Sequence, residues 1–110
     1  MEDLGVLGRL SNGAKSMQIL DFMIENRQDS YTIPEIAKEL QISLKTTFET
    51  VKKFQRLGLV KIDRIVGNTR LYMLNEELPA VKQLIRTTFE IASIEIDQEL
   101  KRQEEQQITA

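Results

Sequence analysis

Seven lysine and arginine side chains fall in one stretch of the sequence, residues 43–74, which holds only two carboxylates. The formal charge of this stretch is +5, whereas residues 1–42 carry −3 and residues 75–110 carry −4, so the overall value of −2 hides a basic centre. Cations grouped in this way bind phosphates by charge and by releasing counterions from a nucleic acid. An ordinary solvated surface with clustered charges is the alternative. The seven residues are Lys45, Lys52, Lys53, Arg56, Lys61, Arg64 and Arg70.

Other chemistry finds little support in the residue types. The 110 residues include no histidine and no cysteine, so the commonest general base and the thiolate metal ligands are missing. The sequence also contains no Gly-rich phosphate loop, no nucleophile elbow and no carboxylate cluster at metal-loop spacing. We therefore predict no catalytic residue, no metal site and no cofactor, and we do not expect an enzyme.

Composition indicates a folded protein of the cytoplasm. Hydrophobic residues make up 41% and charged residues 29%, and 110 residues suit one compact domain with an additional helix. No run of about 18 apolar residues occurs, which argues against a membrane span. The first ten residues start acidic and lack the basic region of a signal peptide.

The elements that would carry the basic residues follow from periodicity and from capping residues. Apolar spacing predicts a first helix over Ala14–Asn26 and a second over Ile33–Leu40. The second begins with Thr32 and Glu35 at capping-box spacing, with Pro34 in its first turn. Tyr31-Thr32 before it could form a very short strand.

Ser43 is a good N-cap for a third helix, predicted over residues 43–57 and followed by Gly58 in a left-handed C-terminal turn. With Val51 at the centre of its buried face, four side chains fall within about 60° of it at ~100° per residue. They are Leu44, Thr47, Phe48 and Phe54, and we expect Leu44 and Phe48 to be core residues. The opposite side holds Lys45, Thr46, Glu49, Thr50, Lys53 and Arg56.

Two alternating segments, 59–65 and 69–74, flank the turn residues Val66-Gly67-Asn68 and predict a β-hairpin. Asn75 could then cap a final helix of about 25 residues, with a polar tail after it, and Pro79 is either tolerated near its start or splits a short turn from the main helix. The predicted organisation is an N-terminal arm (1–12), a helix-turn-helix domain with a wing (13–75), a C-terminal helix (76–105) and a tail (106–110). The fold class is mainly α with a small β-hairpin.

Several segments resemble the winged helix-turn-helix regulators of the ArsR-like and MarR-like superfamily. Residues 31–43 (YTIPEIAKELQIS) are similar to the opening of their helix-turn-helix, and Leu57-Gly58-Leu59-Val60 to the entry into their wing. Residues 71–75 with Pro79 and Val81-Lys82 resemble the exit from the wing in archaeal and bacterial members. The likeness covers roughly residues 11–85. It implies a winged helix-turn-helix fold and a sequence-specific transcriptional regulator, usually a homodimer.

Two departures from that family concern the predicted reading helix. Phe48 stands where such proteins often have a small polar residue, and Thr47 occupies a position that is usually apolar. The absence of histidine and cysteine also excludes the thiolate metal sensing of part of the ArsR-like group.

Two sets of residues are predicted to contact double-stranded DNA. The third helix would read the major groove, and the hairpin would contact the backbone or the minor groove. The alternatives are a solvated helix face, with Glu49 paired to Lys45 or Lys53, and strand-edge charge that prevents aggregation. The predicted reading residues are Ser43, Lys45, Thr46, Glu49, Thr50 and Lys53. The predicted backbone or wing residues are Lys52, Arg56, Lys61, Arg64, Asn68 and Arg70.

The final helix has more apolar surface than a domain of about 70 residues can cover. Burial against a symmetry mate would give a two-fold dimer, whereas packing on the first helix and the N-terminal arm is the alternative. The predicted dimer interface comprises Leu84, Ile85, Phe89, Ala92, Ile96 and Leu100. The sequence thus favours a dimeric, sequence-specific DNA-binding regulator. A partition or chromosome-architecture protein that spreads on DNA and a protein-interaction module remain alternatives.

Overall fold

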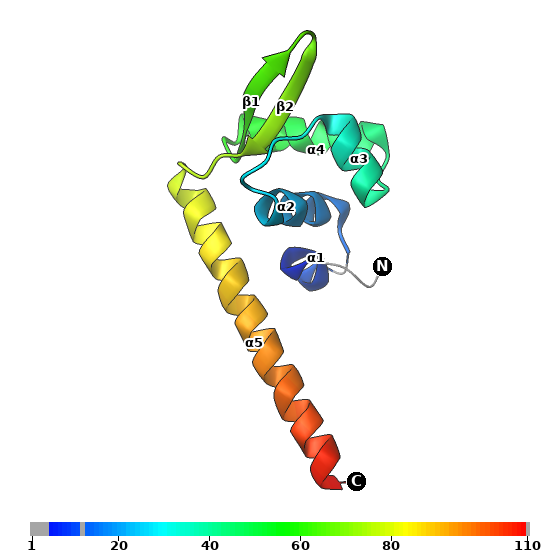
Figure 1. The fold of residues 1–110 in the computed structure, drawn as a ribbon, viewed down its shortest axis with the longest axis vertical. Coiled ribbons are helices and arrows are strands. Elements are labelled where there is room, and N and C mark those ends of the chain that lie inside the picture. Colours follow the sequence, from blue (N-terminus) through cyan, green and yellow to red (C-terminus); the bar gives the residue numbers. More distant parts are fainter. Residues whose placement is uncertain (1–4, 12, 110) are drawn as a thin grey trace.

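The computed structural model describes residues 5–11 and 13–109, which form five helices and one hairpin that projects from one end of the molecule (Figure 1). The predicted arm of residues 1–12 lies partly outside the described residues; its described part contains a short helix. In chain order the elements are α1 (Val6–Leu10), α2 (Lys15–Glu25), α3 (Ile33–Leu40), α4 (Leu44–Arg56), β1 (Val60–Val66), β2 (Thr69–Leu74) and α5 (Pro79–Thr109).

The start of α3 has the predicted capping box. The Thr32 hydroxyl accepts from the Glu35 N–H, and the Glu35 carboxylate accepts from the Thr32 N–H at 2.8 Å. Gln41 then takes a left-handed conformation, with φ at 55°, which ends the helix and turns the chain toward α4. The Ser43 hydroxyl accepts from the Thr46 N–H and caps α4 as predicted. These local contacts fix the helix-turn-helix.

The wing is an antiparallel hairpin whose tip is Gly67-Asn68, with Gly67 at φ +61°. Its register shifts between Ile62 and Arg64, so Asp63 forms a bulge and both Asp63 and Arg64 are exposed. The predicted short strand is a single bridge, in which Tyr31 and Tyr72 exchange backbone hydrogen bonds of 2.9 and 2.7 Å. This bridge ties the start of α3 to the base of the wing.

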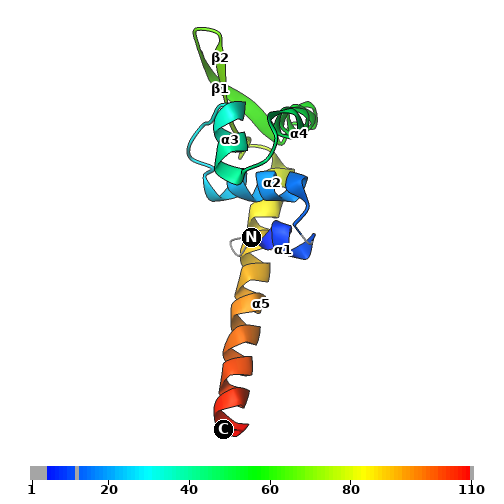
Figure 2. The same cartoon turned by 90° about the vertical axis from the view of Figure 1, so that its right-hand side faces the viewer.

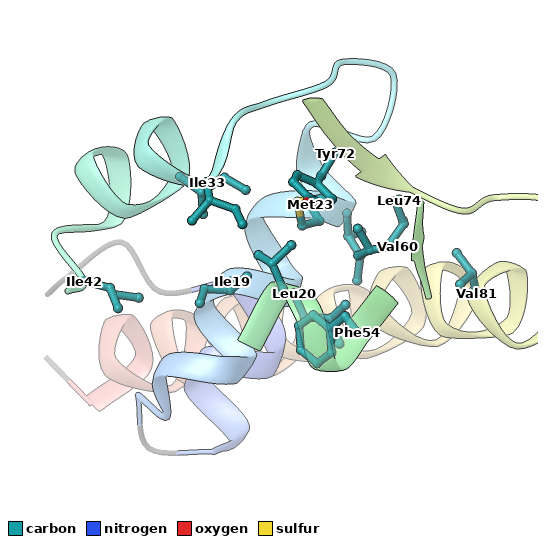
Figure 3. Close-up of a cluster of buried hydrophobic side chains, with 13 residues drawn as sticks. Ile19, Leu20, Met23, Ile33, Ile42, Phe54, Val60, Tyr72, Leu74 and Val81 are labelled. Atoms are coloured by element: carbon teal, nitrogen blue, oxygen red, sulfur yellow. The ribbon is translucent and has the colours of Figure 1, made fainter. Parts of the chain in front are cut away.

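The core gathers side chains from α2, α3, α4, the hairpin and the first turn of α5 (Figure 3). Val51 of α4 and Val81 of α5 are fully buried in it, as are Ile19 and Ile36. Thr47 is also fully buried, as its position on the helix predicted, and its hydroxyl donates to the Ser43 carbonyl at 2.9 Å. That bond satisfies the one polar group of the side chain.

The expectation that Leu44 and Phe48 are core residues is wrong: they are 58% and 52% exposed. They lie at the edge of the apolar face of α4. The start of α3 and the wing stand beside them and leave a groove, so no described element covers them.

The final helix begins later and ends later than the sequence predicts. Residues 76–78 form a turn, and α5 starts at Pro79. Asn75 does not cap it; its side-chain amide donates to the Gly58 carbonyl at 3.0 Å and closes the base of the wing. The helix continues to Thr109, beyond residue 105, where the tail was expected to begin. Contacts of Glu99 with Arg102 and Gln103 support this last part.

Helix α5 gives the molecule its elongated shape, with extents of 61 × 29 × 19 Å. Both views place the wing and the end of α5 at opposite ends of the long axis (Figures 1 and 2). The first part of α5 packs on the domain, and the rest extends past α1 away from it. No helix within the described residues is both long enough and apolar enough to span a membrane.

Candidate nucleic-acid interface

The third helix of the helix-turn-helix, α4, has Lys45, Lys53 and Arg56 on the side away from Val51, and Lys52 about 100° around the axis from it. Lys45, Lys53 and Arg56 are exposed and Lys52 is half-buried. Within residues 5–11 and 13–109, none of these four side chains forms an ion pair with a carboxylate. Glu49 is exposed on the same side and does not pair with Lys45 or Lys53, the alternative role considered for it. The charges of α4 are therefore available to a ligand.

The wing adds two further exposed cations, Arg64 and Arg70, on its two strands, with Asn68 exposed at the tip. As on α4, neither arginine has a carboxylate partner among the residues that the structure describes. Lys61 differs, because its ammonium group lies 3.3 Å from the Glu77 carboxylate. This pairing neutralises Lys61 at the base of the wing, so we expect the least from it among the predicted backbone-contacting residues.

A groove of about 450 Å³ lies between α4, the wing and the start of α3. Of the predicted site residues, Asn68 and Arg70 line it. Leu44 and Phe48 also line it, and they were missed because their positions on the helix assigned them to the core. The departure of Phe48 from the family pattern was the signal that could have marked it.

The two threonines of the predicted reading set, Thr46 and Thr50, lie on another side of α4. At ~100° per residue, Thr46 and Thr50 fall about 160° around the helix axis from Phe48. Both are half-buried, whereas Lys45 and Lys52 fall within about 60° of Phe48. The side of α4 that lines the groove is therefore apolar, with Lys45 and Lys52 next to it around the axis, and the threonines lie away from the groove.

A second hollow, of about 420 Å³, separates α1 and α2 from the middle of α5. Arg27 lines this hollow. Its guanidinium lies 5.5 Å from the Phe89 ring centre and 3.5 Å from the Glu76 carboxylate. Arg9 of α1 pairs with Glu95 of α5. These contacts join α1 and the turn after α2 to the region around the start and middle of α5.

The predicted dimer residues divide into two groups along α5. Leu84 and Ile85 are half-buried against the core of their own chain, and half-buried Ala92 lines the second hollow. Phe89, Ile96 and Leu100 are exposed and fall within about 40° of arc on one side of the helix. Ile96 and Leu100 offer a free apolar surface, whereas Phe89 also lines the second hollow and contacts Arg27.

Comparison with solved structures shows that this fold is known in other proteins. A possible transcriptional regulator from Methanosarcina mazei superposes with a TM-score of 0.55 and 15% identity, covering 88% of this chain and 84% of its own. A double mutant of Lactococcus lactis ZitR in apo form superposes with a TM-score of 0.59 and 24% identity, covering 91% of this chain and 78% of its own. A single mutant of the same protein superposes with a TM-score of 0.57 and 22% identity, covering 82% of this chain and 61% of its own. No family model matches the sequence, and no curated protein matches it.

Together, the element order, the capped helix-turn-helix, the hairpin and these superpositions define a winged helix-turn-helix fold with a long C-terminal helix. At these identities the likeness concerns the fold.

Proposed function

We propose that this chain is a homodimeric protein that binds double-stranded DNA in a sequence-specific manner and regulates transcription. The unpaired, exposed cations of α4 and the wing are the observation on which the proposal rests. An α-helix fits the major groove, and a basic hairpin beside it can contact the flanking phosphates or the minor groove. The Methanosarcina mazei protein with this fold is itself described as a possible transcriptional regulator. Membership of the ArsR-like and MarR-like superfamily is part of the proposal.

The proposed dimer surface and the proposed DNA-binding surface lie on different parts of the chain. Residues 13–75 would bind DNA, and the exposed stripe Phe89, Ile96 and Leu100 of α5 would pack against the same stripe of a second copy. Because α5 points away from the wing, self-association there leaves both basic surfaces uncovered. Two reading helices related by two-fold symmetry would contact half-sites about one DNA turn apart, which predicts a pseudo-palindromic target.

Binding to a random duplex across a salt series tests DNA recognition. We expect the logarithm of the affinity to fall linearly with the logarithm of salt concentration, by about 0.9 for each phosphate contacted. Lys53→Ala should weaken binding, whereas Lys101→Ala, near the far end of α5, should not. No binding at low salt, or an affinity that ignores salt, would refute the proposal.

Selection of bound sequences from a random DNA pool tests specificity. A regulator should enrich one pseudo-palindromic sequence with half-sites about ten base pairs apart. Length-dependent cooperative coating without an enriched sequence would instead indicate a partition or architectural protein.

A further inference from the structure

The groove beside the reading helix has two large apolar side chains that the fold does not use. Leu44 and Phe48 are more than half exposed, they are one helical turn apart, and both line the groove between α4 and the wing. Burying such side chains in the domain would stabilise it, yet no described element covers them. Together they form an exposed apolar pair at the edge of the basic side of α4, in position to contact a ligand.

The surroundings of Leu44 and Phe48 are cationic. Arg70 lines the same groove, and Lys45 and Lys52 lie next to Phe48 around the helix axis, both on its side away from Val51. None of these three has a carboxylate partner in the part of the chain that the structure describes. Apolar side chains beside unpaired cations match a ligand with apolar groups next to negative charge. The major groove of DNA is such a surface, because its base edges lie between two phosphate backbones.

One base-edge group in the major groove is apolar, namely the C5-methyl of thymine, which phenylalanine and other apolar side chains can contact. We propose that Leu44 and Phe48 form a thymine-reading pair, and that they select duplexes with thymine at the base pairs facing the first two turns of α4. This inference rests on the proposed function and deepens it. It assigns the main base discrimination of α4 to apolar contact, and it places Thr46 and Thr50 outside that contact.

Replacing thymine by deoxyuridine in the selected duplex tests the pair, because it deletes only the methyl group and leaves the base pairing intact. At one or two positions in each half-site, we expect the affinity to fall about 4-fold for each buried methyl that is lost. Phe48→Ala should lower the affinity for the thymine duplex about 5-fold or more and abolish the response to deoxyuridine at its position. Such non-additivity identifies a direct contact.

Leu57→Ala is the matched control, because Leu57 is 61% exposed just after α4 and lies outside the groove. It should preserve both the affinity and the response to deoxyuridine. Phe48→Ala and Leu44→Ala remove exposed side chains, and unchanged thermal unfolding would verify that the fold is intact.

The outcomes separate the two proposals. If the wild-type chain binds no duplex, the proposed function fails. If it binds a selected duplex but deoxyuridine and Phe48→Ala change nothing, DNA recognition stands and the thymine-reading pair is refuted. That second result would leave the groove to a protein partner.

Discussion

The guanidinium of Arg9 on α1 forms a two-pronged ion pair with the carboxylate of Glu95 on α5, with 2.9 Å between Nε and Oε2. The two residues are 86 positions apart in the sequence. Through this pair, the shortest helix of the fold holds the longest one at its middle. The pair adds to the packing of Val81, Leu84 and Ile85 on the core, which holds the start of α5 on the domain.

The Arg9–Glu95 pair predicts a pH-dependent stability. The hydrogen bond from Arg9 lowers the pKa of the Glu95 carboxyl below its usual value of 4.5, although partial burial opposes the shift. A carboxyl with a lowered pKa in the folded state stabilises the fold above its unfolded pKa, and this contribution disappears as pH falls through the folded pKa. Glu95→Gln should therefore lower the urea midpoint at pH 7, and the difference from wild type should shrink on acidification below pH 4.5.

The control for this titration is Asp97→Asn, an exposed carboxylate two residues along α5. It should leave the urea midpoint unchanged at both pH values, with the protein concentration held fixed. A Glu95→Gln effect of equal size at pH 7 and at pH 3 would contradict the ion-pair explanation.

A second prediction concerns buried Asp21, which holds α1 on α2. Its carboxylate accepts hydrogen bonds from the Leu7 and Gly8 N–H groups, at 3.1 and 2.7 Å, where the α1 backbone has unpaired donors. Asp21→Ala would leave both donors without their acceptor, and we expect a loss of about 2 kcal/mol or more in the free energy of unfolding. Exposed Asp29→Ala serves as the control and should cost little.

The same contact explains Gly5. A Cβ at Gly5 would lie 2.6 Å from the Asp21 Cγ, closer than real Cβ contacts. Gly5→Ala should therefore destabilise the chain in the same direction as Asp21→Ala. Because both changes act on one contact, the double variant should be less destabilised than the sum of the two. Full additivity in chemical denaturation would show that they act separately.

A third prediction concerns Thr47, the buried polar residue of α4. Its hydroxyl donates to the Ser43 carbonyl, which also accepts from the Thr47 N–H at 3.0 Å. Thr47→Val should therefore leave no acceptor unpaired, and we expect the stability to change by less than about 1 kcal/mol. Val51→Ala, one turn away and fully buried, should cost about 2 kcal/mol because it opens a cavity. A Thr47→Val loss as large as that would refute this account.

The local parts of the fold were predictable because their causes are local. Thr32 with Glu35 and Ser43 are capping residues within three positions of their partners, and Gly67-Asn68 is a hairpin tip by residue type. Long-range contacts leave no such signal. Nothing in the sequence pairs Asp21 with the backbone of α1, so that attachment was not foreseen.

The sequence indicated the basic residues of the candidate site, but it did not indicate that apolar side chains would be exposed beside them. Periodicity tells which side of α4 is apolar, but it does not tell how far the neighbouring elements extend over that side. Val51 and Phe54 are covered, whereas Leu44 and Phe48 face the groove. The length of α5 was underestimated for a related reason: residues 103–107 are polar, and polarity alone does not end a helix that has i, i+4 partners.

A fourth prediction separates phosphate contact from base reading. Arg70 lies on the wing, in the same groove as Phe48, and has no carboxylate partner among the described residues. If it neutralises one phosphate, Arg70→Ala should weaken binding to all duplexes alike and reduce the slope of the salt dependence by about 1. Lys61→Ala should have a smaller effect, because Glu77 already pairs with its charge. An equal effect of both variants would show that the ion pair breaks on DNA binding.

A fifth prediction concerns self-association through α5. Ile96 and Leu100 are 60% and 53% exposed on one side of the helix, beyond its contacts with the core, so a charge there should not disturb the fold of one chain. In a dimer the same charge would be buried against an apolar surface, which is strongly unfavourable. Sedimentation of Leu100→Asp should therefore detect a monomer where the wild type is a dimer. Gln98→Asp, about 180° from Phe89 around the axis, should remain dimeric. A dimer that survives both Leu100→Asp and Ile96→Asp at the same concentration would place the interface on another surface.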